Sequence, residues 1–164
     1  MFWILVISYW IHLLATAVWF GGLIVLAVSA VPALRQGTID ENAWLTLQKK
    51  LLPYANLSLV LLLITGFVQM TNDVNYNGFL AVDSVWAWAM LVKHIAFVLL
   101  IAVMAYLQFS FYPAIERTKV LAEKRPSLAA TEQAKLSKRE KQLLWANLLC
   151  AVVILFCTAV ATAV

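Results

Sequence analysis

Charged residues are scarce in this sequence. Of its 164 residues only 12% are Asp, Glu, Lys or Arg, whereas 64% are hydrophobic. Charged residues make up about a quarter of an average soluble domain, and apolar residues make up about half. A soluble domain of this length would not cover its surface with so few charges, which excludes a cytosolic enzyme and a disordered chain. The sequence therefore predicts a protein whose solvent is the lipid bilayer.

Cysteine is equally scarce, and the motifs of several enzyme classes are missing. The two cysteines, Cys150 and Cys157, lie about 10 Å apart on a predicted helix, which is too far for a disulfide. We interpret both as small packing residues and leave open a role for Cys157 near the histidines. The sequence has no glycine-rich phosphate loop, Cys-x-x-Cys, His-Glu-x-x-His or nucleophile triad. Hydrolysis and nucleotide chemistry therefore have no support, and the sequence leaves enzymatic activity open while favouring a non-enzymatic role.

Four continuous apolar stretches dominate the chain. They cover residues of about 2–32, 53–70, 85–113 and 143–164. Each has the ~18 apolar-dominated residues that a helix needs to cross a bilayer, and none alternates as a strand would. The first stretch lacks a positive flank and is about twice as long as a signal-peptide core, which indicates a retained helix. We therefore predict an all-α integral membrane four-helix bundle, with residues 1–164 as a single domain.

The basic residues orient this bundle. They gather in two loops, 33–52 and 114–142, whereas the loop 71–84 and both termini contain no Lys or Arg. By the positive-inside rule, both basic loops are cytoplasmic and both termini are external in a bacterial-type inner membrane. The net charge of +4 then reflects topology, with anionic lipid rather than nucleic acid as its partner. Helix formers after Ser127, the expected N-cap, predict that the fourth helix begins in the cytoplasm.

One helical hairpin occurs twice in the sequence. His12 lies 20 residues before Pro32, and Lys93 lies 20 residues before Pro113. An Ala-Asn-Leu triplet follows an aromatic residue near the start of each returning span. The pattern predicts two parallel-repeat hairpins related by an axis along the membrane normal. It places His12 and Lys93 at the same depth, in the outer half of the bundle.

Few polar side chains inside the spans are candidates for chemistry. Lys93 is the single charged one, and burial of an ammonium at the bilayer centre costs about 2.5–3.5 kcal/mol. Lys93 is therefore a functional candidate, unless its stem snorkels to the outer interface. The two histidines, His12 and His94, fall at matching depth and suit one copper ion or the axial positions of a b-type haem. The alternative is a pair of neutral histidines that are hydrogen-bonded inside the bundle.

Helical periodicity predicts the surroundings of these residues. At about 100° per residue, the polar and sulfur-bearing side chains of the third span share one arc, and the opposite arc faces lipid. Gly21 and Gly22 on the first span are expected to allow close helix approach. The side chains expected around the candidate centre are those of Trp19, Met90, Gln108 and Cys157.

Two stretches resemble a known family. His12-Leu-Leu-Ala-Thr-Ala-Val-Trp-Phe-Gly-Gly22 resembles the first-helix signature of copper resistance D (CopD) domains. Lys93-His94, with Pro113 and Arg117 further on, resembles the lysine-containing helix of that family. CopD proteins are inner-membrane proteins associated with copper uptake or resistance, so the resemblance implies copper handling.

Two other functions stay open. The same pattern of histidine and lysine also resembles HemJ-type protoporphyrinogen oxidases, which implies haem b. A non-catalytic accessory subunit of a larger membrane complex is the third alternative. As protein partners, the sequence leaves open a second copy in a homodimer or the other subunits of such a complex.

Overall fold

The computed structural model describes residues 2–30, 33, 36, 38, 41–78 and 82–164, and almost all of them are helical. Pro32, which marks the predicted repeat, and Arg35, which belongs to the predicted basic loop 33–52, lie outside the described residues. Within the described ranges, four helical segments are long and apolar enough to cross a bilayer: Phe2–Val28, Ala43–Thr71, Val85–Lys124 and Pro126–Ala163. This confirms the predicted all-α fold with four candidate spans. The chain divides into two compact units, Met1–Trp88 and Ala89–Val164.

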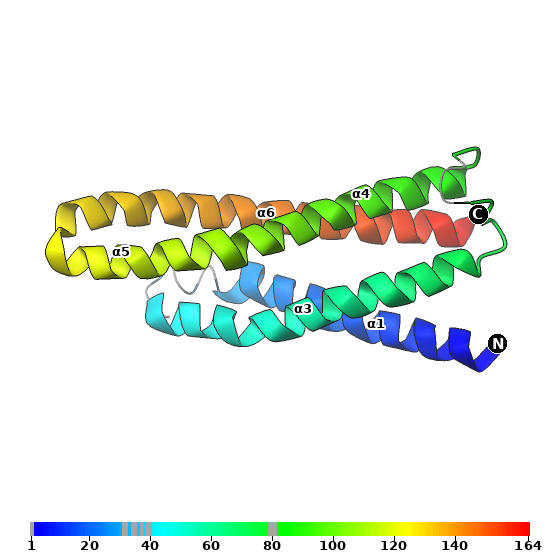
Figure 1. Cartoon of the computed structure of the whole chain (residues 1–164), viewed down its shortest axis with the longest axis horizontal. Helices are drawn as coiled ribbons and strands as arrows, with labels where there is room; N and C mark the ends of the chain where they lie inside the picture. The colour runs from blue at the N-terminus through cyan, green and yellow to red at the C-terminus, as the bar shows by residue number, and fades with distance from the viewer. Residues whose placement is uncertain (1, 31–32, 34–35, 37, 39–40, 79–81) are drawn as a thin grey trace. The chain divides into compact units, whose positions relative to one another are not determined.

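The first unit is a helical hairpin. Helix α1 (Phe2–Ile24) continues into a π-helical turn, η1 (Val25–Ala30), and α3 (Glu41–Thr71) returns alongside α1 (Figure 1). The buried residues of α1 recur at spacings of seven, four and four, which places them on one face of the helix. They are Ser8, Ala15, Trp19 and Leu23.

Helix α3 begins earlier than the apolar pattern predicts. The pattern starts at Pro53, whereas α3 begins at Glu41 and includes Pro53 in its interior. A proline inside a helix removes one backbone hydrogen bond and crowds the carbonyl four residues back. Here the helix continues through it, and Pro53 lies exposed on its surface. Much of the predicted 33–52 loop is therefore helical.

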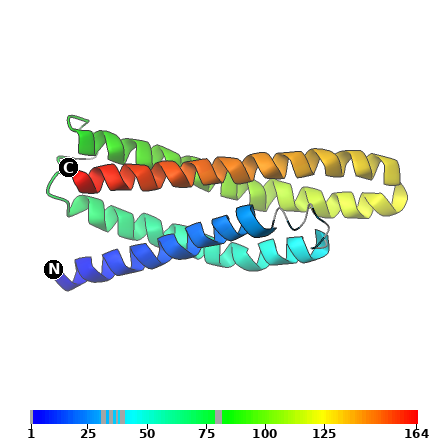
Figure 2. The same ribbon diagram turned by 180° about the vertical axis from the view of Figure 1, so that it is seen from behind.

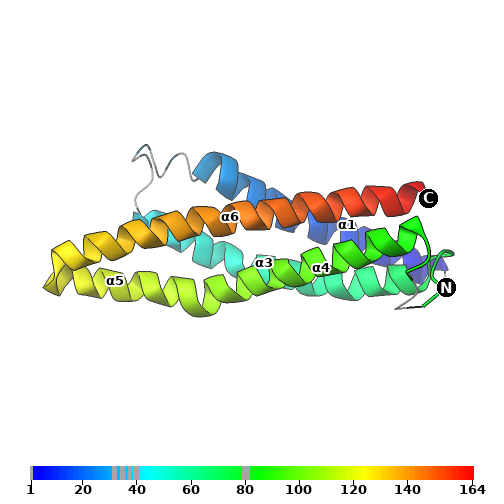
Figure 3. The same cartoon turned by 90° about the horizontal axis from the view of Figure 1, so that it is seen from above.

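The second unit is a longer hairpin. Helix α4 (Val85–Tyr106), which starts at the end of the first unit, the π-helical turn η2 (Leu107–Phe111) and α5 (Tyr112–Lys124) follow one another without a break. The chain then reverses, and α6 (Pro126–Ala163) runs back beside α5 (Figures 2 and 3). At about 1.5 Å per residue α6 is ~57 Å long, against a ~30 Å hydrocarbon core. Part of this hairpin therefore extends beyond the hydrocarbon.

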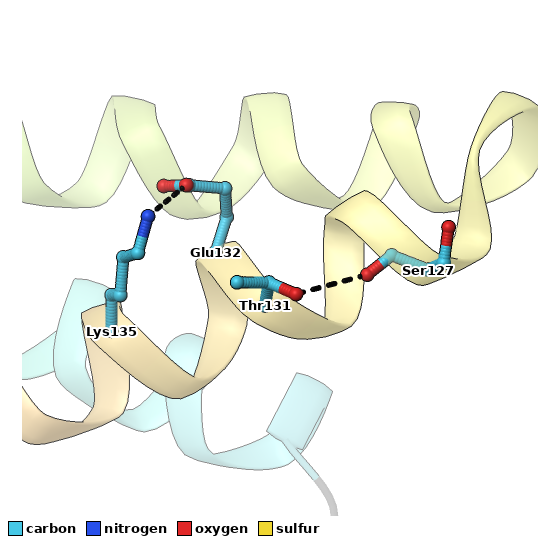
Figure 4. A network of polar contacts seen from close by, with 4 residues as sticks. All are labelled: Ser127, Thr131, Glu132 and Lys135. Atoms are coloured by element: carbon cyan, nitrogen blue, oxygen red, sulfur yellow. Dashed lines mark hydrogen bonds and ion pairs between the residues drawn. The ribbon is translucent and has the colours of Figure 1, made fainter.

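The N-cap residue of α6 differs from the predicted one. The helix begins at Pro126 with Arg125 as its N-cap residue, so the expectation of Ser127 at that position is wrong. Proline suits the first helical position because its fixed φ is already helical and its missing N–H would have no helical partner. Further on, Thr131 Oγ1 donates to the Ser127 carbonyl at 3.2 Å, and Lys135 pairs with Glu132 at 2.7 Å (Figure 4).

The two π-helical turns occupy matching places. Moved along by the 81 positions that separate His12 from Lys93, η1 falls on η2 to within one residue. At η2, the Tyr112 N–H donates to the Leu107 carbonyl five residues back. The wider turn lies directly before Pro113, whose ring would crowd the carbonyl of residue 109 in a regular α-helix.

Buried residues of α1 and α4 are related by the same offset of 81 positions. Three pairs of residues on α1 and α4 are separated by 81 positions and have both members buried: Ser8 and Ala89, Ala15 and Ala96, and Trp19 and Leu100. Two hairpins with matching buried faces and matching π-helical turns agree with the predicted repeat.

Candidate functional site

His12 is bound to the opposite helix of its hairpin. Its Nδ1 lies 2.8 Å from Thr65 Oγ1 on α3, and the side chain is half-buried. Its Cε1 lies 3.5 Å from the position that a Cβ would take at Gly66. One turn along α1, Thr16 Oγ1 donates to the His12 carbonyl at 2.8 Å. The imidazole therefore packs against α3, within ordinary contact distance of the Cβ position at Gly66.

The hydrogen bonds around Thr65 determine the tautomer of His12. The Thr65 hydroxyl has a single proton, and it donates this proton to the Leu61 carbonyl at 2.6 Å. Toward the imidazole, Thr65 Oγ1 can therefore only accept, and His12 Nδ1 must donate. In the neutral ring the lone pair then lies on Nε2. An Nε2 lone pair with Nδ1 held by an oxygen acceptor is the usual arrangement of a metal-binding histidine.

His94 has the same tautomer for a different reason. Its Nδ1 lies 2.6 Å from the carbonyl oxygen of Met90, one turn earlier on α4. A carbonyl can only accept, so Nδ1 donates here too and the neutral ring has its lone pair on Nε2. Met90 thus contacts His94 through its backbone.

Lys93 and Cys157 belong together in the second unit. The Lys93 side chain on α4 is half-buried, and Cys157 on α6 is buried. On the lipid side of α4, Val92, Ile95 and Leu99 are exposed, as the periodicity predicts. Both cysteines are free, in agreement with their spacing.

Asn147 is the most deeply buried polar residue of α6. Its amide nitrogen donates to the Met104 sulfur of α4 at 3.8 Å, and the residue is 2% exposed. Within the described part of the chain, its Oδ1 has no hydrogen-bond partner. A buried carbonyl oxygen without a partner costs free energy, so Asn147 is a weak point in the packing of α4 against α6.

The prediction that Gly21 and Gly22 allow close helix approach is wrong, and a different glycine lies against the neighbouring helix. In the part of the chain that the structure describes, no atom of another helix lies within 4 Å of a Cβ at Gly21 or Gly22. The glycine that brings two helices together is Gly66, under the His12 ring. Trp19 is buried on the same α1 face as Ala15, and Gln108 lies half-buried in η2.

The predicted pairing of His12 with His94 stays a prediction, because the two residues belong to different units. Among the described residues, no group of three or more His, Cys, Asp or Glu side chains is placed to bind a metal ion. Any metal site in this chain would therefore need other ligands, such as a thioether sulfur or the metal's own water.

Sequence reasoning missed Thr65 and the hydrogen bonds next to it. Gln69 Nε2 donates to the Ser8 carbonyl at 3.3 Å, and Ser8 Oγ donates to the Thr65 carbonyl at 3.4 Å. A signal was present in the dipeptide Thr65-Gly66, because small residues inside a span mark close helix contacts.

The four apolar helical segments define an integral membrane protein in contact with the lipid bilayer. A comparison with protein families matches residues 47–161 to the family described as copper resistance protein D, CopD. The match covers more than half of the chain, which therefore belongs to the CopD family. A search of curated proteins and of solved structures returned no match.

The match covers one of the two stretches that carry the predicted resemblance. The match includes Lys93 and His94 but begins at residue 47, after the stretch from His12 to Gly22. It also includes Thr65, the neighbour of His12, and the buried Cys157 of α6.

Proposed function

We propose that this chain takes up copper into the cell across the membrane and binds it on the way at His12 and His94. Membership of the copper resistance protein D family supports copper as the cargo. The observation that carries the proposal is the tautomer of the two histidines. Each donates Nδ1–H to an oxygen, so the ring proton is on Nδ1 and Nε2 is the nitrogen through which each histidine would bind a copper ion.

The remaining candidates have supporting roles in this proposal. Lys93 contributes a positive charge near the site without binding the metal. Trp19 and Gln108 limit the access of lipid and water to the metal. Cys157 is a small buried side chain on the α6 side of the unit that contains Lys93.

The test is copper binding and accumulation by variants of single histidines. We expect His12→Ala and His94→Ala each to weaken copper binding by purified protein at least tenfold, because changes around a metal ligand already cost about 10–100-fold. Cells that express either variant should accumulate less copper than cells that express the parent chain. Leu13→Ala and Ile95→Ala are matched controls, since each removes an exposed neighbour of one histidine.

Equal copper binding by the parent chain and both histidine variants would overturn the proposal. If all of these chains bound copper equally weakly and cellular copper did not change, an accessory role in a larger membrane complex would gain support.

A b-type haem is the second candidate ligand for the same residues. The observation that favours it is again the Nδ1–H donation by both histidines, since axial histidines bind haem iron through the other ring nitrogen. An absorption spectrum of purified protein tests it. A Soret band that is lost in both His12→Ala and His94→Ala would support a haem protein or a HemJ-like oxidase. A spectrum without a Soret band after expression with sufficient haem would exclude it.

A further inference from the structure

Thr65 joins the two helices of the first unit at the candidate site. It is buried at 6% exposure. Its hydroxyl contacts the His12 ring at 2.8 Å and the Leu61 carbonyl at 2.6 Å, and its own carbonyl accepts from Ser8 at 3.4 Å. The hydroxyl is therefore held on both sides and has a defined direction.

The orientation of the Thr65 hydroxyl determines which hydrogen bond the imidazole ring of His12 makes with it. Because the Thr65 proton is donated within α3, the oxygen lone pairs face His12. Cε1 of the same ring lies 3.5 Å from the Cβ position at the adjacent Gly66, so the Nδ1–Cε1 edge of the ring lies against α3. A side chain without a hydroxyl at position 65 would remove this acceptor from Nδ1, and the preference of the ring proton for Nδ1 over Nε2 would weaken.

We propose that Thr65 is a positioning residue that keeps His12 in its Nδ1–H tautomer, so that the Nε2 lone pair is the one offered to a copper ion. This inference rests on the proposed copper site at His12. Thr65 does not touch the metal in this arrangement. It acts through the ring, as the hydrogen-bond acceptors behind metal-bound histidines generally do.

The first test reads the tautomer directly, without metal. The sequence has only two histidines, so protein labelled with ¹⁵N-histidine gives two sets of ring-nitrogen signals, and a His94→Gln variant assigns them. Protonated and unprotonated ring nitrogens are well separated in such spectra. At a pH where the ring is neutral, we expect parental His12 to be protonated at Nδ1. Thr65→Ser should preserve this signal, and Thr65→Val should shift it toward a mixture of tautomers.

Copper binding gives the second readout. We expect Thr65→Val to weaken copper binding about 10–100-fold, which is the usual effect of removing a partner of a metal-bound histidine. Thr65→Ser should bind copper as the parent does. The matched control is Thr71→Val, which removes an exposed hydroxyl that is bonded to carbonyls of its own helix. It should change neither readout.

The outcomes separate this inference from the proposed function. If parental His12 is protonated at Nε2, or if Thr65→Val keeps the parental tautomer, the role of Thr65 is overturned even when copper binds. If the tautomer responds as expected but the parent chain binds no copper, the proposed copper site is wrong, and only the effect of Thr65 on the His12 tautomer stands. Should Thr65→Val fail to fold, the parental spectrum and Thr65→Ser still decide.

Discussion

The two histidines use different kinds of acceptor, and this difference has consequences for mutation. His12 depends on a side chain of another helix, whereas His94 depends on the carbonyl of Met90 in its own helix. Substitution of residue 90 leaves that carbonyl in place. We therefore expect Met90→Leu to keep copper affinity within about twofold of the parent, well short of the ~10–100-fold loss for a removed partner. Titration of purified protein with copper measures this, and a loss above tenfold would assign a direct role to the Met90 sulfur.

Lys93 should act on the redox equilibrium more than on binding. A buried cation favours the less positive state of a nearby metal through electrostatics alone. Lys93→Met retains the bulk of the stem and removes the charge. We expect it to bind copper like the parent and to have a lower reduction potential, measured by redox titration of the loaded protein. If Lys93→Met instead lost a haem-like spectrum while the histidine variants kept it, the lysine would contact a substrate carboxylate or anchor the fold.

Asn147 offers a test of stability at a single residue. Its Oδ1 is buried and has no partner among the described residues, and an amide in that state costs about 1–3 kcal/mol. Asn147→Leu has the same number and branching of side-chain heavy atoms and no polar atom to satisfy. We expect it to raise the midpoint of denaturant-induced helix loss in detergent. A clear decrease in that midpoint would show that the oxygen has a partner in the working protein.

For single residues, the sequence identifies functional candidates when their chemistry differs from that of the apolar residues around them. Lys93, His12 and His94 stand out because titratable side chains are rare and costly inside apolar spans. Thr65 could not be found in this way. A threonine satisfies its hydroxyl on its own helix and is therefore inexpensive anywhere in a span. Its role depends on which residue the other helix places opposite it, and a single sequence does not contain that contact.

At the element scale, apolar runs locate the helices but not their ends. Water beyond the bilayer allows polar residues to continue a helix, so α3 extends back to Glu41 and α6 back to Pro126. The hydrophobic pattern stops at the membrane boundary, whereas the helix stops only where capping and turn residues end it. Membrane helices are thus predictable in number and order. Their extensions into water are predictable where helix formers mark them, as after Ser127, whereas the apolar pattern does not predict the extension of α3 back to Glu41.

The contact between α1 and α3 leads to a prediction about glycine. A methyl group at Gly66 would lie 3.5 Å from His12 Cε1, an ordinary contact distance, whereas a branched side chain would have to displace the ring. We expect Gly66→Ala to unfold like the parent and Gly66→Leu to be destabilised by about 1–3 kcal/mol. Gly21→Leu is the matched control, because no atom of another helix in the described chain lies within 4 Å of its Cβ position. Thermal unfolding in one detergent, followed by circular dichroism, compares the three.

At the scale of the whole molecule, charge is very unevenly distributed. Residues 114–142 contain eight Lys or Arg and four Asp or Glu, a surplus equal to the net charge of +4 of the entire chain. This surplus lies on α5 and on the first half of α6. By the positive-inside rule we expect a reporter inserted near Pro126 to be cytoplasmic and a reporter fused after Val164 to be external. A cytoplasmic reporter after Val164 would contradict the four-span topology with external termini.

The π-helical turn at η2 has a consequence for insertions and deletions. Such a turn contains one residue more than the α-helical turn that it replaces, so it absorbs a surplus residue without changing the faces that follow. Deletion of the exposed Phe109 should convert η2 to a regular helix and leave the later residues in phase. Deletion of Leu99, which is also exposed but lies in regular α4, should rotate Ala96 by about 100° away from Leu100 and disrupt their shared buried face. Length variation in related chains should therefore be tolerated within these two turns and avoided between them.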